Sequence, residues 1–144
     1  MKNVVIAAVL FALSAFADQK ISRNALPAPV LATADKESQG ATLKGYSKEV
    51  ENGQTYYEVE TVRNGKTRDI LIDSNGTVSE VEEEVDMDSL PGPVQKALHA
   101  AAGTAKVIKV EAVKKSGTTT YEAAIRKGAK TSEIKVDAEG KVIK

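Results

Sequence analysis

A gapless internal duplication is the feature that most constrains what this chain can fold into. Shifting the sequence by 64 residues aligns residues 25–80 with residues 89–144, and 15 of the 56 pairs are identical. The identical positions include turn glycines and prolines, and the alternating apolar positions repeat with them. Repeated turns and repeated periodicity indicate a repeated fold, since repeated composition alone does not keep both.

Each copy begins with a segment that predicts a helix. In the second copy, prolines at 91 and 93 suit a first helical turn, where a missing N–H has no partner. Apolar residues then form one stripe from Val94 to Ala102, and Gly103 ends it. The first copy starts in the same way, with a helix expected over residues 27–39.

The remainder of each copy predicts about four strands. Asn52-Gly53, Asn64-Gly65 and Asn75-Gly76 are hairpin dipeptides spaced 11 to 12 residues apart, and the second copy has similar turns. Between them apolar and polar residues alternate, which gives each sheet one apolar face. The predicted fold class is therefore α+β, with two tandem repeats that each pack one helix on a four-stranded antiparallel meander.

The expected domain organisation follows from the duplication. We predict a signal peptide over residues 1–17, a lead-in over 18–24, repeats over 25–80 and 89–144, and an acidic linker over 81–88. Residues 18–88 carry 8 basic and 15 acidic residues, whereas residues 89–144 carry 11 and 5. Opposite charge of this size favours docking of the halves or self-association.

The N-terminus has the pattern of an exported protein. A short positive start precedes an apolar run from Val4 to Phe16, and Ala15-Phe16-Ala17 is a small-x-small cleavage site. The run has 13 residues, fewer than the roughly 18 that a membrane span needs. We expect cleavage after Ala17 and a periplasmic or secreted protein without membrane insertion.

The order of these pieces resembles a PepSY-like domain, twice over. The resemblance rests on Leu90 to Leu98, Val107 to Val110, Thr120-Tyr121-Glu122 and Ile134 to Val142, with matching segments in the first copy. The tandem arrangement resembles the β-lactamase-inhibitor-like proteins. The resemblance implies an exported domain that binds or inhibits proteins such as peptidases, and it supplies no catalytic residues.

Composition and motifs argue against most chemistry. The chain has no Cys and zero formal charge, which excludes thiol catalysis, cysteine-ligated zinc and the basic surface that nucleic acid requires. His99 is the only histidine and lies in no catalytic motif, so we expect an exposed helix residue. We predict no enzyme, no catalytic residue, no metal ligand and no cofactor.

Two acidic features leave an alternative open. Asp73 to Gly76 and Asp137 to Gly140 resemble calcium loops, but they lack the full EF-hand spacing and are better interpreted as type I turns. Residues 80–88 include six acids, which usually form a solvated strand end. The alternative function is a cation-responsive, calcium-binding envelope module that uses this acidic linker.

A difference between the copies suggests the binding site. On the strand face of Glu58 and Glu60 the first copy carries Tyr56, Val62 and Leu71, where the second has Thr120, Arg126 and Lys135. Apolar groups rimmed by acids often mark interfaces, although a second repeat or subunit could equally cover them. We therefore predict a non-enzymatic protein-binding module, an inhibitor or modulator of a peptidase or other envelope enzyme.

Overall fold

The computed structural model describes residues 19–143, so the predicted leader lies outside the described residues. Within this range there are two α-helices and nine strands; the first five strands pair in chain order, and so do the last three. The register is antiparallel in the pairs described below. The α+β class is thus confirmed. None of the helices in residues 19–143 is long and apolar enough to cross a bilayer.

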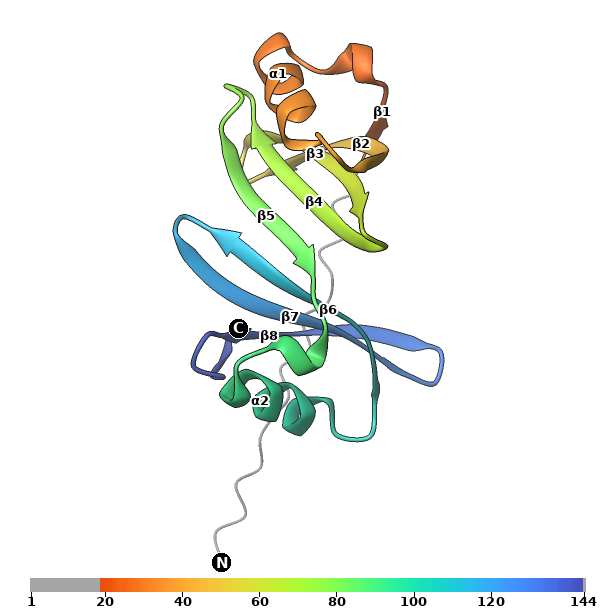
Figure 1. The fold of residues 1–144 in the computed structure, drawn as a ribbon, viewed down its shortest axis with the longest axis vertical. Coiled ribbons are helices and arrows are strands. Elements are labelled where there is room, and N and C mark those ends of the chain that lie inside the picture. The colour runs from red at the N-terminus through yellow and green to blue at the C-terminus, as the bar shows by residue number, and fades with distance from the viewer. Residues whose placement is uncertain (1–18, 144) are drawn as a thin grey trace, which may run out of the picture. The chain divides into compact units, whose positions relative to one another are not determined.

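The chain forms two compact units (Figure 1). The N-terminal unit comprises residues 19–84 together with Val113–Thr118, and the C-terminal unit comprises Val85–Ala112 and 119–143. The N-terminal unit contains β1 (Gln19–Ile21), α1 (Ala28–Glu37), β2 (Thr42–Glu51), β3 (Gln54–Arg63), β4 (Lys66–Asp73) and β5 (Val78–Glu84). The second copy forms α2 (Gly92–Ala102), β6 (Lys106–Lys115), β7 (Thr118–Lys127), β8 (Lys130–Asp137) and β9 (Val142–Ile143).

The strand count differs from the prediction in the first copy. The lead-in forms β1, in which Lys20 pairs with Ser47 of β2, so five strands precede the second copy. Three residues without an apolar alternation carry no sequence signal for a strand. They become one because the free edge of β2 offers unpaired backbone groups.

In the N-terminal unit, α1 covers one face of the strands (Figure 1). Val30 and Ala34 are fully buried one turn apart on this helix, as an amphipathic stripe requires. They pack against alternate residues of β2, β3 and β4. The cluster consists of Leu26, Val30, Ala34, Tyr46, Tyr57, Val59, Ile70 and Ile72.

The C-terminal unit repeats this construction. Val94 and Leu98 of α2 are fully buried, and Gly103 caps the helix with a positive φ of 57°. Tyr121 of β7 opposes Val136 of β8, as Tyr57 of β3 opposes Ile72 of β4 at the same 64-residue offset. Its core consists of Leu90, Val94, Leu98, Val110, Ala123, Ile125, Ile134 and Val136.

Both copies join the start of the helix to the last turn of the meander. Gly76 has a φ of +85°, and a Cβ built there would lie 2.6 Å from the Pro29 carbonyl oxygen. Gly140 has a φ of +84° and would approach the Pro93 oxygen to 2.5 Å. Only glycine fits both the left-handed backbone and this close approach.

Candidate partner-binding surface

The five predicted site residues lie on the face of the N-terminal unit's sheet opposite α1, here called the open face. Strand β3 directs Tyr57, Val59 and Thr61 into the buried layer, so the alternate residues project to the other side. Leu71 opposes Glu58 across β3 and β4 and therefore shares that side. The structure thus brings the predicted residues together: Tyr56, Glu58, Glu60, Val62 and Leu71.

The apolar members of the site are half-buried, whereas the sequence predicted them to be exposed. Tyr56, Val62 and Leu71 sit in the interior of the sheet, between strands on both sides. Side chains on the two neighbouring strands shield a central side chain from solvent, because their Cβ atoms lie only about 5 Å away. The Tyr56 hydroxyl also donates a hydrogen bond to Gln54 Oε1 at 2.8 Å.

The two predicted steering carboxylates both have partners within the unit. Glu58 accepts a 2.6 Å hydrogen bond from the buried Ser47 hydroxyl. Glu60 forms an ion pair with Lys20 of β1, which was not expected because β1 itself was not. Both contacts hold these side chains on the open face, and the Lys20 ammonium also offsets the charge of Glu60.

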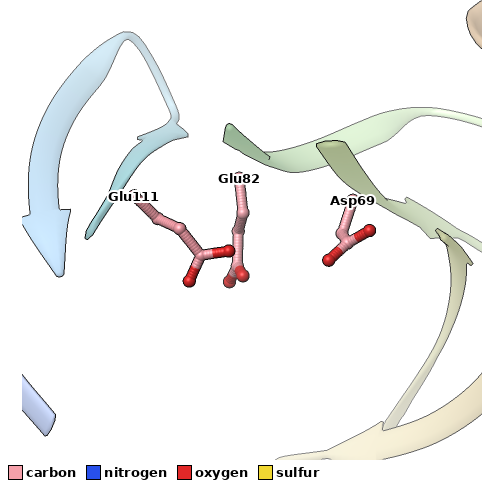
Figure 2. A group of neighbouring side chains, drawn as sticks. All are labelled: Asp69, Glu82 and Glu111. Atoms are coloured by element: carbon pink, nitrogen blue, oxygen red, sulfur yellow. The ribbon is translucent and has the colours of Figure 1, made fainter. Parts of the chain in front are cut away.

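The register places further carboxylates on the open face that sequence reasoning missed. Glu49 and Asp73 flank Tyr56 on β2 and β4, and Glu80 opposes Leu71 on β5. Asp69 and Glu82 face each other across β4 and β5 and point to the same side (Figure 2). Alternation along each strand was visible in the sequence, but the pairing that collects these groups was not.

A further cation, in addition to Lys20, shares this face within the N-terminal unit. Lys115 forms a 2.8 Å ion pair with Glu80. A hydrogen bond to Glu80 raises the pKa of Lys115, although partial burial opposes the shift. The open face is therefore acidic but not uniformly so.

The acidic segment 80–88 is largely part of the sheet, because residues 80–84 belong to β5. Glu83 Oε1 lies 3.2 Å from Arg68 Nε, and Glu83 Oε2 lies 2.7 Å from Lys114 Nζ. The hydrogen bond from Lys114 lowers the pKa of Glu83. Glu84 accepts hydrogen bonds from the Thr67 backbone N–H and hydroxyl. The calcium-binding alternative depends on the carboxylates of this segment, and two of them, Glu83 and Glu84, are already paired with groups of the protein.

The two Asp-x-x-Gly segments are turns, as predicted. The Gly76 N–H donates to the Asp73 carbonyl at 3.0 Å, and Asp73 Oδ1 accepts from the N–H groups of Asn75 and Thr77 at 2.9 Å. Asp137 makes the equivalent contacts in the second copy. An Asp that caps its own turn in this way explains the motif by turn chemistry.

The corresponding face of the C-terminal unit is polar and carries charge of both signs. Lys135 forms an ion pair with Glu122. Lys109 Nζ lies 2.6 Å from Glu111 Oε1, and Figure 2 shows the Glu111 side chain. Burial raises the pKa of Glu133, and the neighbouring Glu122 carboxylate raises it further. Only the first copy combines an aromatic ring with aliphatic side chains on this face among the described residues.

Comparison with protein families finds a match within the first copy. Residues 30–82 match the PepSY family, described as "Peptidase propeptide and YPEB domain". A search of curated proteins finds no match.

Solved structures share the fold across most of the chain. A protein from Bacteroides eggerthii described as periplasmic is 18% identical, with a TM-score of 0.68 over 83% of this chain and 86% of that chain. A DUF2874 family protein from Bacteroides uniformis is 20% identical, with a TM-score of 0.65 over 82% and 86%. A BLIP-like protein from Bacteroides fragilis is 18% identical, with a TM-score of 0.60 over 83% and 84%.

The family match falls on the first copy, and the structural likeness spans both copies. The expected resemblance is therefore confirmed by the family match within the first copy and by the fold of the solved structures. The chain thus contains a match to the PepSY family over residues 30–82, and its fold is similar to that of a BLIP-like protein.

Proposed function

We propose that this protein is an exported, non-enzymatic protein-binding module whose partner contacts the open face of the N-terminal unit. One observation carries the proposal: Tyr56, Val62 and Leu71 lie outside the α1-covered core, among carboxylates, where the second copy has polar residues. Apolar side chains that a unit's own core does not use, rimmed by charge, are typical of interface centres.

The partner class in this proposal is a peptidase or another envelope enzyme, which the module inhibits or modulates. The PepSY match and the BLIP-like fold support binding rather than catalysis. His99 is exposed on α2, away from the buried stripe of that helix, which supports a solvent-facing role. The leader pattern and the relatives described as periplasmic support export.

The experiment is a comparison of three variants of the mature protein as bait in an envelope extract. Tyr56→Ala removes the ring from the open face, and Thr120→Ala makes a change at the aligned position of the second copy. We expect a protein that the wild type and Thr120→Ala retain and that Tyr56→Ala loses, because truncating a central interface tyrosine can cost about 2 kcal/mol or more.

A fold control separates binding from stability. Tyr57 is only 9% exposed and belongs to the core, so Tyr57→Ala should lower the free energy of unfolding by about 3–5 kcal/mol, as buried aromatic truncations do. Tyr56→Ala should cost less, because its ring is only partly buried and lies outside the core cluster. Equal retention by Tyr56→Ala and the wild type, or equal unfolding losses for the two tyrosine variants, would refute the proposed surface.

A further inference from the structure

We infer that a hollow beside Tyr56 on the open face binds an arginine side chain, supplied by the partner. The inference rests on the proposed function and deepens it, since it names the chemistry that the surface recognises. Its evidence is the shape and lining of the hollow, the register of the strands around it, and the difference between the two copies.

The hollow has a volume of about 300 Å³ and lies at one end of the N-terminal unit's sheet. Residues 54–56 at the start of β3 form one side, residues 73–75 at the end of β4 form another, and Ser79 completes it. This volume is at the lower limit of ligand sites, so it suits one long side chain rather than a folded element.

The lining is rich in oxygen acceptors and includes one aromatic residue, Tyr56. Gln54 Oε1 already orients the Tyr56 hydroxyl at 2.8 Å, and the Thr55 carbonyl accepts from Ser74 at 3.2 Å. Asp73 contributes the carboxylate, with its Oδ1 held by the turn. Within the described chain, the residues that line the hollow include no Lys, Arg or His.

The surroundings of the ring are mainly acidic, and Lys115, which is paired with Glu80, is a cation within electrostatic range of Tyr56. Glu49 stands opposite Tyr56 on β2, and Asp73 stands opposite it on β4. Glu58 is two residues further along β3 and points to the same face. A cation that enters the hollow therefore meets Tyr56 and carboxylates on both neighbouring strands.

Arginine matches this combination better than other side chains. Its planar guanidinium stacks on an aromatic face and donates up to five hydrogen bonds in the plane. Oxygen acceptors beside an aromatic ring suit this planar set of donors. The ammonium group of lysine is a compact point charge and has no planar group to stack on the ring. The charge excess of residues 18–88, with 15 acids against 8 bases, favours the approach of a basic partner.

The second copy offers a natural comparison. Thr120 replaces Tyr56, and Val113 replaces Glu49 at the aligned positions. Ala138 replaces Ser74 in the turn. The duplication has thus kept the backbone turn in both copies but placed the ring and the flanking carboxylate in one.

The test uses two short peptides, acetyl-Ala-Arg-Ala-amide and the same peptide with citrulline in place of arginine. Citrulline has nearly the same shape as arginine but no charge. Titrations into the mature protein, followed by NMR chemical shifts, should give about fivefold tighter binding of the arginine peptide. The shifts should centre on residues 54–56 and 73–75, and added salt should weaken the binding.

Three variants locate the binding. Tyr56→Phe keeps the ring and should retain the preference, Tyr56→Ala should abolish it, and Thr120→Ala should leave it unchanged. Equal affinity for both peptides, or a preference that survives Tyr56→Ala, would overturn the inference.

The inference and the proposed function fail separately. If the retained envelope protein depends on Tyr56 but the arginine peptide shows no preference, the arginine hollow is wrong and the partner surface stands. If the peptide binds as expected but no retained protein depends on Tyr56, the hollow stands as a cation site and the partner surface is wrong.

Discussion

Alanine at Gly76 tests whether the contact between the last turn of the meander and the start of α1 stabilises each copy. Gly76 has a φ of +85°, and its added Cβ would lie 2.6 Å from the Pro29 carbonyl oxygen and 2.8 Å from the carbonyl carbon. Both neighbours are backbone atoms of the first helical turn. The clash is therefore relieved only if the turn and the helix move apart.

The expected loss has two parts. A left-handed backbone costs a residue with a Cβ about 1–2 kcal/mol. Overpacking against a fixed neighbour adds about 1–3 kcal/mol. We expect Gly76→Ala to lower the free energy of unfolding by about 2–5 kcal/mol in total.

Gly53→Ala is the matched control. Gly53 has a φ of +79°, but nothing lies within 4 Å of its added Cβ. This variant should lose only the backbone part, about 1–2 kcal/mol. The difference between the two variants thus isolates the contact with Pro29.

The assay is urea unfolding followed by circular dichroism, and the second copy supplies a repeat of it. Gly140→Ala carries the clash, at 2.5 Å from the Pro93 oxygen, and Gly117→Ala has a φ of +76° and open space. If each clashing variant loses no more than its control, the close approach contributes nothing to stability and the reasoning is wrong.

Three further predictions concern charge and export. Burial and the neighbouring Glu122 raise the pKa of Glu133, so the folded state binds the carboxyl proton more tightly than the unfolded state does. The protonated side chain therefore stabilises the fold at low pH, and this contribution is lost as the pH rises. Glu133→Gln should be more stable than the wild type at neutral pH and lose that advantage in acid, measured by urea unfolding. The hydrogen bond from Lys114 lowers the pKa of Glu83, so the ionised carboxylate stabilises the folded state at neutral pH. This contribution to the free energy of unfolding is lost as the pH falls. Glu83→Gln should remove that acid sensitivity, and high salt should reduce the effect since the pair is partly exposed. Sequencing of the exported protein should begin at Asp18, and a start at Met1 would contradict cleavage.

Local patterns in the sequence determined the repeat, the helices and the turns. Val94 and Leu98 fall one helical turn apart, and Tyr57 alternates with Tyr56, so period alone assigned each to a buried or an open face. Asp73 and Gly76 identify a turn by chemistry within four residues. Such features depend on neighbours along the chain, which a sequence displays directly.

Only the tertiary structure determined which residues the buried and open faces contact. Strand β1 exists because an edge of β2 is available to pair, and it brings Lys20 to Glu60, 40 residues away. Register between strands places Glu49 and Asp73 beside Tyr56 and half-buries the ring. These contacts join residues far apart along the chain. They follow from the closure of loops and the packing of a whole unit, which no local period encodes.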